Sequence, residues 1–267
     1  MRIASPLAGT DVELRHRELG NPDGKPLVFL HGGWGYGFYP FDAQIAELGR
    51  DHRILIPERT GYGRSTPVTT FPARFHEAAA IEVEHFLDAL AIDRCALWGH
   101  SDGAVIATIM ALRQPARYSA LILEALHLER EKPRSRAFFT MMAEDPDGFG
   151  ERVAARLATD HGERWREVLR TGGRVWLDIA ATPDADFFDH RLDELAVPTL
   201  VVHGTDDPRT EPTELDRIRR EVPNATIHMI AGGTHSPHSE RAVSAETTRL
   251  AAAFARSQTP SAALAPA

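Results

Sequence analysis

The chain has 267 residues, of which 43% are hydrophobic and 25% are charged, and its formal net charge is −8 at pH 7. This length supports one sizeable hydrophobic core, or one core with a subdomain. The acidic balance and the lack of any block of basic residues exclude nucleic acid as an expected partner.

Short apolar runs bounded by turn residues recur along the chain and predict buried strands. Continuous apolar runs of this length suit strands that are covered on both faces, as in a parallel sheet. The runs are PLVFLHGG (26–33), HRILIPE (52–58), RCALWGH (94–100), SALILEA (119–125), PTLVVHG (198–204) and ATIHMIAGG (225–233).

Helical patterns lie between these runs. FHEAAAIEVEHFLDAL (75–90) places apolar residues at helical spacing, and SAETTRLAAAFARS (244–257) predicts a terminal amphipathic helix. GAVIATIMALRQP (103–115) is apolar nearly all round, which predicts a buried helix ending at Pro115. Strands that alternate with helices predict an α/β fold with a doubly wound, mostly parallel sheet.

One region breaks the alternation. Residues 128–195 show no buried-strand pattern and are rich in Arg, Glu and aromatic residues. We predict that they form a helical cap inserted into a core made of residues 1–127 and 196–256. The tail SQTPSAALAPA (257–267) lacks apolar periodicity, which predicts disorder.

Ser101 lies between two glycines in LWGHSDGAVIATIMAL (97–112), where a predicted strand ends and a predicted helix begins. Gly99 and Gly103 allow a tight turn there, because neither brings a Cβ atom into it. The pattern is Gly-x-Ser-x-Gly, the nucleophile elbow that exposes a serine at a helix N-terminus. The alternative is an ordinary turn between two elements. The residues that follow the other predicted strands decide between these two interpretations.

The strand predicted at 26–33 runs into LHGGWGYG (30–37). Backbone N–H groups free of bulky side chains can bind a developing oxyanion. A flexible loop or a phosphate cradle are the alternatives, but no phosphate-binding glycine register fits this stretch.

Asp206 and Asp207 follow the strand predicted at 198–204. A carboxylate there can orient a histidine, and an Asp before a proline can also simply start a turn. We expect one residue in each role.

His235 follows the last predicted strand in AGGTHSPHSER (231–241), and His238 is its rival. A zinc site would need two histidines on one helix or a third ligand cluster, and Pro237 breaks such a helix. We therefore expect no metal and no cofactor.

The chain order Ser, Asp, His is that of α/β-hydrolases. The motifs HGGW (31–34), ERTGYGRS (58–65), GHSDG (99–103), HGTDDP (203–208) and GGTHSPHSE (232–240) resemble those of the α/β-hydrolase superfamily in order and spacing. The branch they resemble has a serine nucleophile and a helical cap. The resemblance is specific for fold and nucleophile and weak for substrate.

This resemblance implies Ser101 as nucleophile, His235 as base and, from the family's His-Gly-x-x-Asp pattern, Asp207 as acid, with Asp206 as a turn residue. Two departures from the family pattern are Glu58 in place of Asp, which we interpret as structural, and Thr234 where Gly is commoner.

The resemblance further implies that the backbone N–H groups of Gly33 and Asp102 form the oxyanion hole, with Trp34 as an alternative donor. A serine at the elbow forms an acyl-enzyme that water then releases. An aspartate there would suit the alkyl transfer of the family's dehalogenases and epoxide hydrolases.

The leading prediction is a serine hydrolase for a small or medium carboxylic ester, and thus a small-molecule partner. The alternatives are a peptidase or amidase, a hydrolase of C–C bonds in vinylogous diketones, and a non-catalytic small-molecule receptor. HGGWG (31–35) is similar to the HGGPG of proline iminopeptidases without reproducing it. The sequence leaves the oligomeric state open.

Four further residues are candidates for substrate binding. Glu124 and His127 follow a predicted strand in LILEALHLER (121–130), where they are either polar groups of the pocket or exposed loop residues. Glu124 is also a rival for the role of the catalytic acid. Phe139 and Trp176 are predicted to face the substrate from the cap.

The cellular setting is also an expectation. The single cysteine, Cys95, cannot form an internal disulfide and suits a reducing compartment. The N-terminal sequence has no signal-like apolar stretch, and no run approaches the roughly 18 apolar residues of a membrane helix. We expect a soluble cytoplasmic protein that does not bind membranes.

Overall fold

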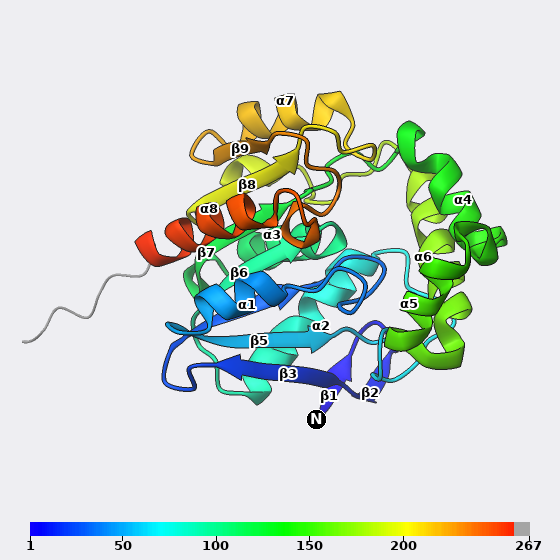
Figure 1. Ribbon diagram of the computed structural model, residues 1–267, viewed down its shortest axis with the longest axis horizontal. Coiled ribbons are helices and arrows are strands. Elements are labelled where there is room, and N and C mark those ends of the chain that lie inside the picture. The colour runs from blue at the N-terminus through cyan, green and yellow to red at the C-terminus, as the bar shows by residue number, and fades with distance from the viewer. Residues whose placement is uncertain (259–267) are drawn as a thin grey trace, which may run out of the picture.

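A computed structural model of the chain describes residues 1–258, and its centre is a seven-stranded sheet (Figure 1). The first strand in the sheet runs antiparallel to its neighbour, and all other neighbours are parallel. In spatial order the strands are β3 (Arg15–Gly20), β5 (His52–Glu58), β4 (Lys25–Leu30), β6 (Cys95–His100), β7 (Tyr118–Glu124), β8 (Thr199–Gly204) and β9 (Thr226–Ile230).

Helices cover both faces of this sheet. Side chains of the central strands alternate between two cores: Leu27 and Phe29 of β4 join one, and Val28 and Leu30 join the other. The prediction of a doubly wound, mostly parallel α/β sheet is confirmed. One core includes α1 (Asp42–Leu48) and α8 (Ser244–Ser257), and the other includes α2 (Phe75–Ala89), α3 (Asp102–Arg113) and α7 (Pro212–Glu221).

The sequence analysis missed the strands at the beginning of the chain. β1 (Arg2–Ser5) and β2 (Thr10–Glu13) form an antiparallel pair, and β3 forms one edge of the main sheet. β3 reads RHRELG and is exposed along most of its length. It carries no apolar run because neither of its faces is deeply buried.

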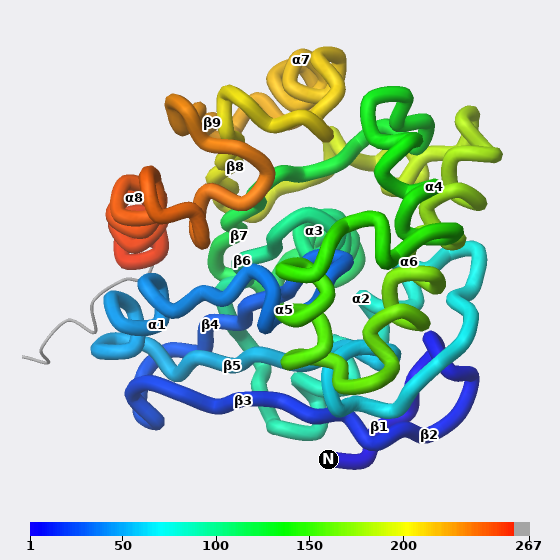
Figure 2. The backbone as a smooth tube through the Cα atoms, turned by 45° about the vertical axis from the view of Figure 1, so that its right-hand side comes forward, coloured from blue at the N-terminus to red at the C-terminus, as the bar shows by residue number. Residues whose placement is uncertain are grey.

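The segment 128–195 is helical and contains no strand. Its main helices are α4 (Arg136–Glu144), α5 (Glu151–His161) and α6 (Trp165–Ala180), which lie together at one end of the sheet strands (Figures 1 and 2). A Cβ atom on Gly173 of α6 would lie only 2.7 Å from the Phe139 carbonyl oxygen of α4. Glycine therefore permits the close approach of these two helices. We call residues 128–195 the cap, and its boundaries remain a prediction.

The predicted tail can be compared with the structure only at its first residues. Of the tail 257–267, for which disorder was predicted, Ser257 is the last residue of α8 and Gln258 follows it as the helix cap, so the prediction was wrong for its start; the rest, from position 259 onward, lies outside the described residues. Within residues 1–258, none of the helices combines the length and the apolar character that a membrane crossing requires.

A buried, hydrogen-bonded carboxylate–histidine pair fixes the loop after β9 to the middle of the sheet. Glu124, at the end of β7, is fully buried. Its Oε1 accepts hydrogen bonds from the backbone N–H (3.0 Å) and Nδ1 (2.8 Å) of His238, and its Oε2 accepts one from Trp98 Nε1 (3.2 Å). His238 Nε2 donates to the Tyr39 carbonyl at 3.0 Å. The loop that carries His235 is thus tied to two strands and to the loop before α1.

The charge of Glu124 depends on this partner. Burial raises the pKa of Glu124, but the charge and hydrogen bonds of His238 outweigh it and lower the pKa to about 2, from 4.5. Because the folded-state pKa is the lower one, the ionised carboxylate stabilises the fold above pH 4.5. That contribution is lost as the pH falls from 4.5 toward 2.

We predict that Glu124→Gln lowers the free energy of unfolding by about 2–4 kcal/mol at pH 7, because an amide cannot accept all the hydrogen bonds that the buried carboxylate accepts from His238 and Trp98. Urea unfolding of the wild type should weaken more steeply between pH 5 and pH 3 than that of Glu124→Gln. Glu47→Gln, which removes an exposed ion pair with Arg256, is the control and should cost less than about 1 kcal/mol. Identical pH dependence of wild type and Glu124→Gln would contradict the assignment.

Candidate active site

Ser101 occupies a strained turn between β6 and α3. Its backbone has φ 55° and ψ −119°, a region that non-glycine residues rarely adopt. A Cβ atom on Gly99 would collide with the Gly103 carbonyl, and one on Gly103 would collide with the Leu30 carbonyl. Only glycine at these two positions lets the turn close against β4, which is the physical basis of the Gly-x-Ser-x-Gly pattern.

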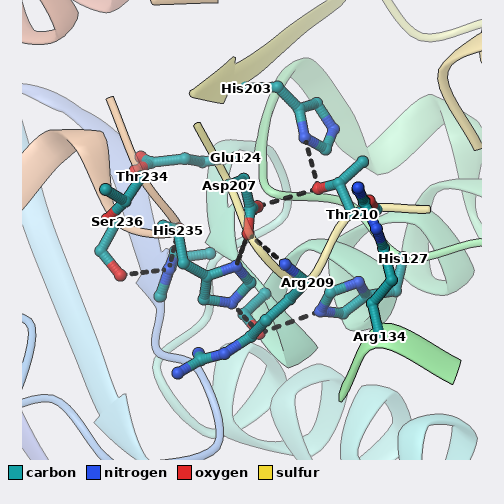
Figure 3. Close-up of polar contacts among 12 residues, drawn as sticks. Glu124, His127, Arg134, His203, Asp207, Arg209, Thr210, Thr234, His235 and Ser236 are labelled. Carbon is teal, nitrogen blue, oxygen red and sulfur yellow. Dashed lines mark hydrogen bonds and ion pairs between the residues drawn. The ribbon is translucent and has the colours of Figure 1, made fainter. Parts of the chain in front are cut away.

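The structure brings Ser101 together with His235 and Asp207. His235 Nε2 lies 3.0 Å from Ser101 Oγ, and His235 Nδ1 lies 3.0–3.1 Å from both carboxylate oxygens of Asp207. Asp207 also accepts hydrogen bonds from the Arg209 backbone N–H and the Thr210 hydroxyl, each at 2.8 Å (Figure 3). The carboxylate is therefore fixed in its orientation toward the histidine.

The neighbouring acidic candidates lie elsewhere. Asp206 is exposed, and its carboxylate accepts a hydrogen bond from Thr205. Glu124 pairs with His238 and not with His235. Of the three carboxylates considered for the acid, Asp207 alone reaches His235.

The charges of this pair follow from their surroundings. Burial raises the pKa of Asp207, but His235 and the hydrogen bonds outweigh it and hold the pKa well below its usual value. Burial, followed by the positive charge of Arg209, lowers the pKa of His235 although Asp207 opposes the shift. A neutral imidazole with its Nδ1–H donated to a carboxylate has a free lone pair on Nε2, which can accept the proton of Ser101.

The loop after β4 and the start of α3 meet beside Ser101. Neither the N–H of Gly33 nor that of Asp102 donates a hydrogen bond within residues 1–258. A Cβ atom on Gly33 would lie 2.9 Å from Asp102 Oδ2, and one on Gly32 would lie 3.2 Å from Ser101 Cβ. The glycines therefore allow the loop after β4 to approach the serine closely. Trp34, the alternative donor, follows directly and lines the same pocket.

The loop after β4 is held by a residue whose role the sequence analysis did not identify. Arg59 is fully buried; its guanidinium donates to the carbonyls of His31 and, at 3.2 Å, Gly32, and its backbone N–H donates to His31 Nε2. Arg59 belongs to ERTGYGRS, so the motif itself was the available signal. Glu58, the departure in this motif, accepts a hydrogen bond from the Arg64 backbone at 3.0 Å, in agreement with a structural role.

The side chain of Asp102 anchors the first turn of α3. Its Oδ1 accepts hydrogen bonds from His76 Nε2 of α2 at 3.1 Å and from Trp176 Nε1 of the cap at 3.0 Å. Burial raises the pKa of Asp102, and the contact with His76 outweighs it, so the net shift is downward. A buried carboxylate thus links the elbow to a core helix and to the cap.

A narrow pocket lies in front of Ser101. Three of the four predicted substrate-binding residues line it, namely His127, Phe139 and Trp176. Glu124 does not line the pocket. Its carboxylate oxygens already accept hydrogen bonds from His238 and Trp98, so the expectation that Glu124 contacts substrate is corrected. The remaining lining residues are Gly33, Trp34, Tyr39, His100, Ser101, Asp102, Phe138, Met142, Gly172, Arg209 and His235.

His127 is a second histidine at the nucleophile. Its Nε2 lies 3.4 Å from Ser101 Oγ, and its ring is nearly parallel to that of His235, with 5.5 Å between the ring centres. Its Nδ1 is buried without a hydrogen-bond partner among the described residues. Burial holds the pKa of His127 well below its usual value. His127 is therefore a neutral polar group of the pocket and not an exposed loop residue.

His100, Glu124 and His238 offer ligand atoms within 4.8 Å of one another, an arrangement that could hold a metal ion. These groups are already engaged, however. His238 uses both ring nitrogens, for Glu124 and the Tyr39 carbonyl, and His100 Nε2 donates to the His235 carbonyl at 3.0 Å. The cluster therefore serves as a support for the histidine loop, a role that no short sequence motif indicated.

The chain is similar in sequence to a family of known hydrolases and to individual members of it. The profile described as "Alpha/beta hydrolase family" matches residues 27–247. Serine hydrolase BPHL from Homo sapiens is 25% identical over 242 residues, which cover 87% of this chain and 80% of that protein. The 2-hydroxy-6-oxo-2,4-heptadienoate hydrolase of Pseudomonas putida is 26% identical over 238 residues, covering 79% of this chain and 83% of that enzyme.

Solved structures give the same fold. A thermophilic esterase from Thermogutta terrifontis superposes with a TM-score of 0.73 at 20% identity, covering 97% of this chain and 98% of that one. At this identity the likeness speaks for the fold alone. The family match extends over most of the chain and includes Ser101, Asp207 and His235. The resemblance stated from the motifs is confirmed: the chain belongs to the alpha/beta hydrolase family, a class of enzymes that includes its serine hydrolase relatives.

Proposed function

We propose that the protein is a serine hydrolase that cleaves a small or medium carboxylic ester through an acyl-enzyme on Ser101. The observation that carries the proposal is the continuous contact from Ser101 Oγ to His235 Nε2 (3.0 Å) and from His235 Nδ1 to Asp207 (3.0 Å). All three side chains are buried or nearly so, which strengthens the interactions between them.

The reaction follows from this geometry. Ser101 Oγ attacks the ester carbonyl carbon while His235 Nε2 takes the hydroxyl proton. The N–H groups of Gly33 and Asp102 stabilise the oxyanion. When the intermediate collapses, the C–O bond to the alcohol breaks and His235 gives its proton to the leaving oxygen. Asp207 fixes the histidine tautomer and stabilises the imidazolium.

Deacylation repeats the steps with water. A water molecule attacks the acyl carbon and transfers a proton to His235, and the bond to Ser101 Oγ breaks. The carboxylic acid leaves as the histidine returns the proton to the serine, which regenerates the free enzyme. No cofactor is needed for atoms and electrons to balance.

One experiment distinguishes ester hydrolysis from the alternative reactions, which are amide hydrolysis and C–C bond hydrolysis. The Pseudomonas putida relative bears the name of a 2-hydroxy-6-oxo-2,4-heptadienoate hydrolase, which keeps C–C bond hydrolysis as an alternative. Turnover of a panel of p-nitrophenyl esters, lactones, amino-acid amides and a vinylogous diketone ranks ester, amide and C–C cleavage. Binding without steady turnover of any member would instead indicate a receptor.

Ser101→Ala should lower kcat for ester hydrolysis by about 10⁶-fold with an unchanged circular dichroism spectrum, because the attacking oxygen is lost. A fluorophosphonate should label the wild type at Ser101 only, as located by mass spectrometry of peptides. Ser257→Ala, an exposed serine, is the control and should be labelled like the wild type. Stoichiometric labelling of Ser101→Ala would refute the nucleophile.

Asp207→Asn should lower kcat by about 10⁴-fold, because an amide favours the wrong histidine tautomer and removes the charge that stabilises imidazolium. The matched variant is Asp206→Asn, the neighbouring exposed carboxylate, which should keep kcat within about three-fold of the wild type. The measurement is kcat on p-nitrophenyl butyrate at saturating substrate. A reversed order of the two variants would move the acid to Asp206.

Phe139→Ala should shift acyl-chain preference toward longer chains. The Phe139 ring stacks on Trp176 with 4.9 Å between ring centres, and both line the pocket. We expect the ratio of kcat/KM for the octanoate to the acetate p-nitrophenyl ester to rise about ten-fold, since space is opened for methylene groups. Phe188→Ala, a buried residue of the cap that does not line the pocket, should leave the ratio unchanged. A ratio that is the same in both variants would make Phe139 a core residue only.

A further inference from the structure

Arg209 stands in the pocket without a counter-ion. It follows the catalytic acid candidate by two positions and lines the same pocket as Ser101. Among the described residues, no carboxylate lies within 4.0 Å of its guanidinium, and its side-chain N–H groups reach no hydrogen-bond acceptor. Some other arginines of the chain do have carboxylate partners, as Arg166 has Asp147 and Arg217 has Asp186.

Packing fixes the position of this guanidinium. Its carbon Cζ lies 3.9 Å from the centre of the Phe138 ring, and Phe138 in turn stacks on Trp34 with 5.4 Å between ring centres. A guanidinium that lies over an aromatic ring keeps the N–H groups at its edge free for a planar partner. Figure 3 shows the side chain extending past His235, away from His203 and Thr210. Arg209 is thus held in place by its neighbours on the pocket wall.

Among the described residues, no polar group of the pocket pairs directly with this charge. Burial lowers the pKa of both His100 and His127 well below the usual value, so these rings are neutral. Asp102, the carboxylate among the lining residues, already accepts hydrogen bonds from His76 and Trp176. The charge of Arg209 does reach the reacting groups, because it contributes to the lowered pKa of His235.

A cation that is positioned, unpaired and beside the nucleophile calls for an anionic ligand group. A single guanidinium matches a singly charged planar group in two-point contact, whereas a phosphate dianion in a confined pocket would need further cations. We propose that Arg209 binds a carboxylate of the substrate, so that the hydrolase acts on esters that carry a carboxylate near the scissile bond. This inference rests on the proposed function and deepens it by naming a substrate class.

The test compares matched charged and neutral esters. The acyl pair is the p-nitrophenyl monoester of adipate and p-nitrophenyl hexanoate, and the leaving-group pair is 4-acetoxybenzoate and 4-acetoxybenzamide. For Arg209→Gln, the ratio of kcat/KM for the charged to the neutral member should fall about 10- to 100-fold in one of the two pairs. The pair that responds tells whether the carboxylate belongs to the acyl or to the alcohol part.

Two further variants separate charge from packing. Arg209→Lys keeps the charge but not the two-point contact, and should retain a ratio between those of the wild type and Arg209→Gln. Arg156→Gln removes another arginine that lies over an aromatic ring, Phe38, but does not line the pocket, and should leave the ratio unchanged. Equal losses on charged and neutral esters in both pairs, for Arg209→Gln, would overturn the proposal.

A second measurement does not need turnover. Adipate and benzoate, but not hexanamide, should slow fluorophosphonate labelling of Ser101 in the wild type, and Arg209→Gln should abolish the protection by the responding anion. If no ester is hydrolysed but this Arg209-dependent protection is seen, the esterase function fails and the carboxylate site stands. If esters are hydrolysed and neither the ratios nor the protection depend on Arg209, the site fails and the esterase function stands.

Discussion

The turn at Ser101 is the constraint around which the rest of the site is arranged. A serine held at φ 55° costs conformational energy, which the surrounding structure has to supply. The turn is held between β6 and α3 and pressed against the end of β4, where only glycine at positions 99 and 103 fits. The strained turn therefore places the hydroxyl at the carboxyl end of the parallel strands. The loops after β4, β8 and β9 begin at the same end.

Three buried carboxylate–histidine pairs surround this turn, and their geometry separates chemistry from support. Asp207 holds His235, whose other nitrogen faces Ser101. Glu124 holds His238, whose other nitrogen is bound by a backbone carbonyl, and Asp102 is held by His76 of α2. A histidine can pass protons to a substrate only when its second nitrogen is free of structural work. Of the three histidines, only His235 directs its second nitrogen at Ser101, which supports the proposal that it is the base.

The parts of this architecture that follow from short-range patterns were visible in the sequence. Six strands, β4 to β9, and the order of Ser101, Asp207 and His235 were predicted, because each lies in a run or motif that is contiguous in the chain. Of these strands β9 is mostly half-buried, where a buried strand was predicted. The supports were not: Arg59 acts on the loop after β4, His76 on Asp102, and His238 on Glu124 across 114 positions. Such contacts depend on how distant segments meet. The motif around Arg59 was a signal for one of them, but His76 and His238 as single polar residues carry no sign of their partners. Arg209 is similar, since only the fold shows that it faces the pocket without a partner.

The strand that the sequence analysis missed has a consequence for association with other chains. β3 is an edge of the sheet, and among residues 1–258 no strand pairs with the outer side of its backbone. β3 carries the exposed residues Arg15, Arg17 and Glu18; Arg17 lies over the Tyr36 ring and Glu18 pairs with Arg53 of the neighbouring strand. A second protein that added a strand here would have to strip water from charges on both faces of the pleat. The same polarity that hides β3 from pattern-based prediction therefore protects the sheet from edge-to-edge aggregation.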